Sequence, residues 1–213
     1  IDIVELKEQS AKLAPACKQH FVDVIKDSPE IYFNKDIMGV ALSYTYEMEK
    51  YIAQKIYEAK ELDKQGNNQW ELSDVEKYRK IDGFDLSDEQ MQTLPNVCQH
   101  TITILNGSAG AGKSSSTLAV INMLKDLKKT CLLLAPTGRA SKILSEYTKQ
   151  PASTIHRGLG FDGAWRYNED NKLVYDIVIV DEFSMCDVNL FYRLLCAIDL
   201  KKTKLLLIGD SSQ

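Results

Sequence analysis

Apolar residues in the first third of the chain recur three or four positions apart, which is the spacing of one face of a helix. The clearest stripe predicts one amphipathic helix from about Gly39 to Leu62, with charged and polar residues on its other faces. Comparable signals predict shorter helices at residues 3–12, 17–26 and 73–80. We therefore expect residues 1–83 to form a small all-α region.

From residue 84 onward, continuous apolar runs alternate with helical stretches. The apolar runs predict strands at residues 101–105, 130–135, 176–180 and 204–208. The stretches between them predict helices at residues 114–127, 139–148 and 188–198. Continuous apolar strands separated by helices indicate a parallel sheet that is covered on both faces. We expect residues 84–213 to form such an α/β domain, with a small hairpin near residues 165–175.

A phosphate-binding loop lies between the first predicted strand and the first predicted helix of this domain. Residues 107–114 complete the pattern G-x-x-x-x-G-K-[ST]. Its glycines let the backbone turn consecutive N–H groups toward phosphate oxygens, Lys113 brings a cation to the β- and γ-phosphates, and the Ser114 hydroxyl can bind Mg²⁺. The expected nucleotide-binding residues of the loop are Gly107, Ser108, Ala109, Gly110, Ala111, Gly112, Lys113, Ser114 and Ser115.

Two later strands are also predicted to end in side chains that suit phosphate chemistry. The strand at 176–180 is followed by Asp181 and Glu182, and the strand at 204–208 leads to Asp210 and Gln213. In an open α/β sheet, the carboxyl ends of the strands carry the active site. We expect Asp181 to hold Mg²⁺ through a water molecule and Glu182 to deprotonate the attacking water. Gln213 is a candidate sensor of the γ-phosphate, although a simple strand–turn also explains residues 209–213.

Three more segments carry side chains suited to binding, and each also has a simple structural explanation. At residues 135–140, Thr137 or Gly138 caps the next helix, and its backbone N–H groups are free for a phosphate of a nucleotide or of a nucleic acid. His156 is a surface residue, a core residue whose hydrogen bonds are satisfied, or a contact to a nucleic-acid backbone or base. The Gln90 amide can pair with N6 and N7 of adenine, or it is a surface residue at a helix start.

The charge distribution changes this picture more than the overall composition does. The 213 residues have a net charge of −4, yet residues 1–95 hold 12 Lys/Arg against 19 Asp/Glu, whereas residues 96–213 hold 14 against 11. The acidity therefore belongs to the N-terminal part, and a local basic groove is compatible with the remainder. Apolar residues make up 44% and charged residues 26%, as in an ordinary globular protein.

Cysteine usage and the two ends of the chain add three expectations. The five cysteines are widely spaced without a C-x-x-C pair, so we expect neither a disulfide framework nor a zinc site, and a cytoplasmic protein with reduced thiols. There is neither a signal peptide nor an apolar run of about 18 residues, so no membrane span is predicted. The chain lacks an initiator Met and stops directly after a predicted strand, so we expect a fragment.

In their order and spacing, these motifs resemble the RecD-like DNA helicases of superfamily 1B. The resemblance runs from about Leu86 to Gln213. Phosphate-binding loops and Asp-Glu pairs occur in many NTPases, but their combination with Pro-Thr-Gly-Arg-Ala and Thr-Ile-His is much more specific. The segments that carry the resemblance are Leu-Ser-Asp-Glu-Gln (86–90), the phosphate-binding loop, Ala-Pro-Thr-Gly-Arg-Ala (135–140), Thr-Ile-His-Arg (154–157), Val-Asp-Glu-Phe-Ser-Met (180–185) and Gly-Asp-Ser-Ser-Gln (209–213).

The resemblance implies a RecA-like first motor domain that uses ATP and Mg²⁺. In that fold the strand ending at Asp210 lies between the strand of the phosphate-binding loop and the Asp-Glu strand, so that Asp210 and Gln213 face the γ-phosphate. It also implies that Gln90 binds adenine. Single-stranded DNA and duplex/single-strand junctions are the implied partners. The implied DNA contacts are Pro136, Thr137, Gly138, Arg139, Thr154 and His156.

Three positions depart from the family pattern. Phe183 stands where Ala is usual, Ser211 where Pro is usual, and Gly158 where an apolar residue is common. None of these removes a catalytic group, but Phe183 is expected to alter the packing around Glu182.

The predicted function is that of an ATP-dependent DNA helicase that translocates on single strands. The fragment alone is expected to have little activity, because such helicases complete the site with an arginine finger from a second motor domain. Two alternatives are a phosphotransferase acting on a small molecule, and a nucleotide-gated module whose acidic N-terminal region binds a protein partner.

Overall fold

The computed structural model describes residues 3–13, 21–34, 36, 39–66, 68–81, 83–108, 110–210 and 212. The chain divides into two compact units, Ile1–Ala53 and Gln54–Gln213, which are described separately. The division falls within helix α3 (Ser43–Lys64). Residues 54–83 therefore share a compact unit with the sheet, whereas the sequence analysis assigned them to the N-terminal region.

The N-terminal unit is not all-α as predicted, because it contains a β-hairpin. Helices α1 (Ile3–Leu13) and α2 (Phe21–Asp27) precede strands β1 (Ile31–Asn34) and β2 (Gly39–Leu42). The strands pair antiparallel, with Ile31 opposite Leu42. The long helix consequently begins at Ser43 and not at Gly39. A small core forms around Phe21, Ile25 and Val40. The predicted helix start at residue 17 lies outside the described residues.

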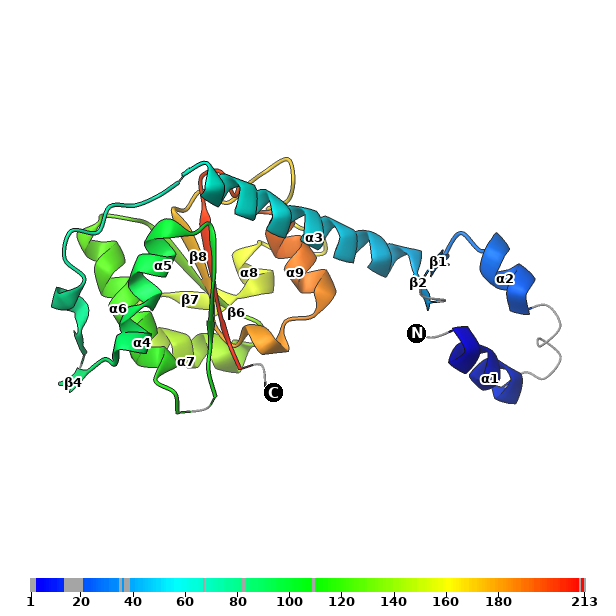
Figure 1. The fold of residues 1–213 in the computed structure, drawn as a ribbon, viewed down its shortest axis with the longest axis horizontal. Coiled ribbons are helices and arrows are strands. Elements are labelled where there is room, and N and C mark those ends of the chain that lie inside the picture. The colour runs from blue at the N-terminus through cyan, green and yellow to red at the C-terminus, as the bar shows by residue number, and fades with distance from the viewer. Residues whose placement is uncertain are drawn as a thin grey trace. The chain divides into compact units, whose positions relative to one another are not determined.

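The larger unit is built on a five-stranded parallel sheet, as the sequence predicts (Figure 1). Four strands match predicted ones, namely β5 (Ile102–Asn106), β6 (Cys131–Ala135), β8 (Ile177–Val180) and β9 (Lys204–Gly209). The short strand β7 (Ala152–Thr154) was not predicted. The strand order is β5-β9-β8-β6-β7, so β9 does lie between β5 and β8.

Helices cover both faces of this sheet. On one side lie α5 (Thr93–Gln99), α6 (Lys113–Asp126) and α7 (Gly138–Thr148), and on the other α8 (Ile155–Gly158) and α9 (Val188–Cys196) (Figure 1). All four residues of β8 are fully buried, which explains its continuous apolar sequence. The first of these helix layers packs in one apolar cluster with Ile177, Ile179, Leu206 and Ile208.

Residues 68–81 and 83–91 form mostly irregular structure in place of the predicted helix at 73–80. A single 3₁₀ turn, η2 (Glu76–Tyr78), precedes a two-stranded hairpin of β3 (Lys80–Ile81) and β4 (Phe84–Asp85). The short helix α4 (Asp88–Met91) follows. Tyr78, Ile81 and Leu86 are buried in the same cluster as α5 and α6. This burial explains why the segment belongs to the larger unit.

The hairpin predicted near residues 165–175 is wrong, because the described chain holds no strand between Leu159 and Asp176. The Asn168 side chain instead organises a polar turn, in which its Oδ1 accepts from the backbone N–H groups of Asp170 and Asn171. Asx turns of this kind compete with strand pairing. Among the described residues, no helix is both long and apolar enough to cross a membrane.

Candidate functional site

The predicted site residues converge at the carboxyl edge of the sheet, because the strands that deliver them are parallel. Asn106 at the end of β5 lies opposite Gly209 of β9, and Val180 at the end of β8 lies opposite Leu207 of β9 and Leu134 of β6. The loops that follow these four strands therefore leave the sheet side by side. This placement brings together the phosphate-binding loop, the Asp-Glu pair, Asp210 and the start of α7.

The phosphate-binding loop has the backbone expected of an anion cradle. Gly110 and Gly112 have φ values of 82° and 75°, a region that side-chain-bearing residues rarely adopt. Helix α6 begins at Lys113, so its N-terminal dipole faces the loop. The Lys113 ammonium donates to the carbonyl oxygen of Ser108 at 3.0 Å and also to that of Gly107. Ser114 is exposed on the first turn of α6, while Ala109 lies outside the described residues.

A cavity of about 490 Å³ lies against this loop. It is lined by Ser87, Glu89, Gln90, Leu105, Asn106, Gly107, Ser108, Gly110, Ala111, Gly112, Lys113 and Ser116. Polar backbone and side-chain groups therefore surround a space next to the cation of Lys113. These features suit a nucleotide, because its phosphate oxygens accept hydrogen bonds from N–H groups and pair with a cation.

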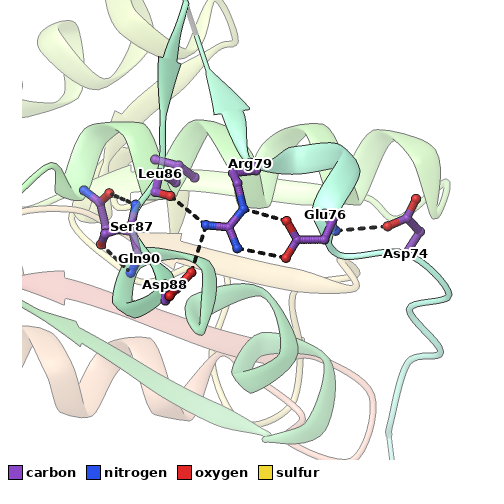
Figure 2. A network of polar contacts seen from close by, with 7 residues as sticks. All are labelled: Asp74, Glu76, Arg79, Leu86, Ser87, Asp88 and Gln90. Carbon is purple, nitrogen blue, oxygen red and sulfur yellow. Dashed lines mark hydrogen bonds and ion pairs between the residues drawn. The ribbon is translucent and has the colours of Figure 1, made fainter.

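Gln90 reaches the loop through a capping box at the start of α4. Its backbone N–H donates to Ser87 Oγ at 3.2 Å, and its side-chain Oε1 accepts from the Ser87 N–H at 2.9 Å (Figure 2). Its Nε2 donates to the carbonyl oxygen of Ala111 at 3.2 Å. A Cβ atom on Gly112 would lie 2.0 Å from this Nε2, so the close approach requires glycine there. The capping box also shows that the helix-start explanation of Gln90 holds.

The Asp181 carboxylate is held from two directions at the end of β8. Its Oδ1 accepts from the backbone N–H of Glu182 at 2.9 Å, and its Oδ2 accepts from the hydroxyl of Tyr147 on α7 at 3.1 Å. Burial, together with the nearby Asp181 charge, raises the pKa of Tyr147 well above its usual range, so the hydroxyl stays protonated and donates. Sequence reasoning did not identify Tyr147.

Glu182 has a left-handed backbone with φ of 53°. Such conformations cost free energy in residues other than glycine, and they persist where the surrounding structure holds them. The turn continues as η3 (Phe183–Met185), and the Phe183 ring packs edge-on against Phe191 of α9, with ring centroids 4.8 Å apart. The aromatic residue at 183 is thus accommodated by a partner on α9.

Asp210 is buried at the end of β9, and its Oδ1 accepts from the backbone N–H of Ser212 at 2.9 Å and from the Ser212 hydroxyl. Gln213 and Ser211 lie outside the described residues, so the predicted sensor role of Gln213 stays a prediction. Gly158, the third departure from the family pattern, has a local reason. A Cβ atom there would lie 2.4 Å from Leu134 Cδ2, which occupies the space that a side chain would need.

The residues predicted to contact DNA lie at the start of α7 and on α8. Thr137 and Thr154 are N-caps, since their side-chain oxygens accept from the N–H groups of Ala140 and Arg157, each at 3.2 Å. Gly138 and Arg139 are exposed, while Pro136 is half-buried. A second cavity, of about 300 Å³, joins this region to the acidic pair. Its lining comprises Thr137, Arg139, Ala140, Ile143, Asp181, Glu182 and Met185.

His156 belongs to an aromatic cluster in which His156 and Phe161 are exposed and Trp165 is half-buried. Its ring stacks on Trp165 with centroids 5.4 Å apart and meets the edge of Phe161 at 5.8 Å. The Arg193 guanidinium lies 5.8 Å from the Trp165 ring. The motif that contains His156 did not indicate these aromatic neighbours, because they follow it in a turn-rich segment.

Comparison with known proteins identifies the family of this chain. A family model described as "AAA domain" matches residues 90–213, more than half of the chain. The chain belongs to the AAA domain family. The ATP-dependent RecD2 DNA helicase of Deinococcus radiodurans is 38% identical over 149 residues, which cover 70% of this chain and 20% of that protein. The RecBCD enzyme subunit RecD of Haemophilus influenzae is 32% identical over 154 residues, which cover 60% of this chain and 24% of that protein.

The resemblance to RecD-like helicases is thereby confirmed. The chain spans about a fifth to a quarter of the length of these curated relatives. Among solved structures, the Pif1 helicase from Candida albicans is 25% identical, with a TM-score of 0.45 over 60% of this chain and 33% of that one.

The AAA domain therefore brings most of the predicted site residues to one edge, and the structure shows two further residues, Tyr147 and Arg79, that the motifs did not contain. Tyr147 contacts Asp181, although the two are 34 positions apart. Tyr147 stands three positions after the buried Leu144, so both lie on the same face of α7. This helical spacing is the sequence feature from which an inward-facing Tyr147 could have been predicted. Arg79 lies before the matched range 90–213 and contacts the segment that carries Gln90 (Figure 2). No motif marked it.

Proposed function

We propose that this chain is the ATP-binding motor domain of a RecD-like DNA helicase, which couples ATP hydrolysis to movement on single-stranded DNA. The observation that carries the proposal is the meeting of the phosphate-binding loop, Gln90, the Asp181–Glu182 pair and the start of α7 at one sheet edge. The family membership and the two helicase relatives support the same conclusion.

The loop residues are proposed to bind the triphosphate through backbone N–H groups and Lys113. The ammonium has three donors, so it can keep a carbonyl contact within the loop while it donates to a phosphate oxygen. The adenine is proposed to lie near Gln90, whose second amide hydrogen and second oxygen lone pair are not used by the contacts to Ser87 and Ala111. The cavity of about 490 Å³ between them accommodates this arrangement.

Hydrolysis is proposed to depend on the acidic pair. Glu182 orients the attacking water and accepts its proton, while Asp181 is held still by Tyr147 and by its own neighbouring N–H. Ser114 and Asp181 supply the hydroxyl and carboxylate that a Mg²⁺ ion prefers. When bound, the ion would neutralise charge that develops on the phosphates. Asp210 and Gln213 are proposed to face the γ-phosphate.

Single-stranded DNA is proposed to contact the start of α7 and the region of His156. Exposed Arg139 and the N–H groups at the helix start suit a phosphate, and the rings of His156, Phe161 and Trp165 suit unstacked bases. The cavity that joins Thr137 and Arg139 to Asp181 and Glu182 supports a coupling between DNA binding and hydrolysis. Pro136, Gly138 and Thr154 are proposed to shape this surface.

The test combines nucleotide binding with hydrolysis in the presence and absence of a single-stranded oligonucleotide. We expect Mg-ATP to bind and Lys113→Ala to weaken binding by roughly a hundredfold, as for the loss of a charge-assisted contact to phosphate. Lys125→Ala, an exposed change on the same helix, is the matched control. Hydrolysis stimulated by a small metabolite and indifferent to DNA would indicate a phosphotransferase instead. Unchanged ATP binding by Lys113→Ala would overturn the site assignment.

A further inference from the structure

Arg79 is the centre of a polar network that precedes the nucleotide cavity in sequence (Figure 2). Both carboxylate oxygens of Glu76 accept from its Nε and Nη2. Its Nη1 donates to the carbonyl oxygen of Leu86 at 3.1 Å and to Asp88 Oδ1 at 2.9 Å. The network therefore joins η2 to the first turn of α4.

The backbone of Arg79 reinforces the same connection. Its carbonyl oxygen accepts from the Leu86 N–H at 2.8 Å, which extends the ladder of the β3–β4 hairpin. The Leu86 side chain is buried in the main apolar cluster. Leu86 is thus held by hydrogen bonds to both the main chain and the side chain of Arg79, and its position is fixed by packing as well.

The next residue, Ser87, is bonded to Leu86 through the peptide bond and holds Gln90 through hydrogen bonds. Ser87 and Gln90 form the reciprocal capping box, and Gln90 Nε2 then contacts the Ala111 carbonyl in the phosphate-binding loop. The glycine at 112 leaves space for the amide at a point where a Cβ atom would collide with it. Hydrogen bonds on either side of the Leu86–Ser87 peptide unit therefore connect Arg79 to Gln90 and the loop: Arg79 donates to the Leu86 carbonyl, Ser87 N–H donates to Gln90, and Gln90 donates to Ala111.

We propose that Arg79 is a positioning residue for Gln90, and through it a determinant of the preference for adenine over guanine. This inference rests on the proposed nucleotide site and on the adenine contact proposed for Gln90. It also extends the functional nucleotide-binding unit to residue 76, so that a domain boundary at 83/84 would cut through it.

The shape of the guanidinium matters more than its charge in this network. The Asp88 side chain is 94% exposed and that of Glu76 is 68% exposed, so solvent screens both ion pairs. The planar fork can face Glu76 on one edge while it donates to the Leu86 carbonyl on another. A lysine at this position would keep the charge but could not reproduce both directions. We therefore expect Arg79→Lys to behave more like Arg79→Met than like the parent chain.

The experiment is a double-mutant cycle that measures the ratio of ATP affinity to GTP affinity. ATP and GTP compete with a ribose-labelled fluorescent nucleotide for the 213-residue chain in the presence of MgCl₂. We expect Gln90→Ala to lower the ratio about fivefold or more, the range of a lost bidentate adenine contact. Arg79→Met should lower it roughly threefold, within the coupling range of residues in one network. In the Gln90→Ala background, Arg79→Met should cause no further loss.

Lys77→Met is the matched control, because Lys77 lies in the same 3₁₀ turn but pairs with Asp126 of α6 and not with α4. It should leave the ratio unchanged. Thermal denaturation of each variant separates misfolding from repositioning, and Arg79→Lys provides a second substitution that keeps the charge and solubility. A purely structural role for Arg79 would lower the melting temperature and leave the ratio intact.

The outcomes separate this inference from the proposed function. A ratio that falls for Gln90→Ala but not for Arg79→Met or Arg79→Lys overturns the positioning role and leaves the nucleotide site standing. A ratio that is insensitive to Gln90→Ala contradicts the adenine contact, and the positioning role fails with it. Additive losses in the double variant would also overturn the inference, because they would mean that Arg79 acts on base preference without Gln90.

Discussion

The proposed nucleotide site has two parts, a base side around Gln90 and an acid side at Asp181 and Glu182, which are built from different parts of the chain and held by different forces. On the base side, Gln90 is positioned by hydrogen bonds and partly exposed ion pairs that begin at Glu76 (Figure 2). On the acid side, Asp181 and Glu182 follow β8, whose four residues are fully buried in the centre of the sheet. The backbone that carries the acid side is therefore fixed by packing, whereas the base side depends mainly on directional polar contacts at the surface.

Because of this difference, the two sides should respond differently to salt and to substitutions. Burial of apolar area in the sheet is not an interaction between charges, so salt does not screen it. Exposed ion pairs are screened by salt and contribute little stability by themselves. Substitutions on the base side should accordingly change which nucleotide binds while the domain stays folded, and substitutions on the acid side should change hydrolysis or unfold the domain.

The largest expected effect is on the acid side, for Glu182→Gln. The amide keeps the size of the side chain but cannot accept a proton from water, so we expect hydrolysis to slow by about 10²- to 10⁴-fold. ATP binding and the ratio of ATP to GTP affinity should stay near the parent values. Single-turnover hydrolysis of radiolabelled ATP measures the rate. Glu169→Gln, an exposed change in the turn before β8, is the control. A parent-like rate for Glu182→Gln would show that another group is the base.

The next effect is on stability. Ile179 is fully buried in β8, and Ile179→Ala should lower the free energy of unfolding by about 2–5 kcal/mol. Ile104 on the edge strand β5 is 70% exposed. Ile104→Ala should therefore change the free energy of unfolding by only about 0.5 kcal/mol or less. Urea denaturation compares the two. Arg79→Met should lower the free energy of unfolding about as little as Ile104→Ala does. If Arg79→Met proved as destabilising as Ile179→Ala, the contrast between the two sides would collapse.

The smallest expected effect is for Tyr147→Phe, which removes one hydroxyl from the acid side. The hydrogen bond from Tyr147 to Asp181 is worth on the order of 1 kcal/mol, and without it the carboxylate is held less firmly. Because Asp181 is proposed to help bind Mg²⁺, the increase in nucleotide affinity caused by Mg²⁺ should become a few-fold smaller. Titration of a fluorescent nucleotide with and without MgCl₂ measures that gain. Tyr175→Phe, at the amino-terminal end of β8, should not alter it. An identical gain in parent and Tyr147→Phe would show that Asp181 is positioned without this contact.

Most of the sheet could be predicted because its central strands are continuous apolar runs. β7 was missed, since Ala152–Thr154 is short, only half-buried and rich in hydroxyl side chains, and so resembles a turn. The hairpin of β1 and β2 was missed because its apolar residues blend into the helical stripe that follows. The opposite error occurred near residues 165–175, where alternating aromatic residues suggested strands but the Asn168 side chain stabilises a turn.

Some residues of the candidate site could likewise be predicted from the sequence, and others could not. Lys113, Asp181 and Glu182 stand in short segments whose order already indicates phosphate chemistry, so a role for each could be predicted from neighbouring residues. Their placement together is explained by the parallel sheet, which delivers all strand ends to one edge. Tyr147 and Arg79 could not be assigned in this way, because their roles depend on partners outside any local motif.

By itself, the sequence determined which side chains follow the strand ends, the order of the main elements and the membership in the AAA domain family. These depend on local pattern, namely apolar runs, glycine spacing and contiguous motifs. Only the tertiary structure decided which side chains hold those groups in place. Hydrogen bonds such as those of Arg79 to Leu86 and of Tyr147 to Asp181 require donor and acceptor within about 3 Å. That proximity is created by packing, and no local pattern encodes it.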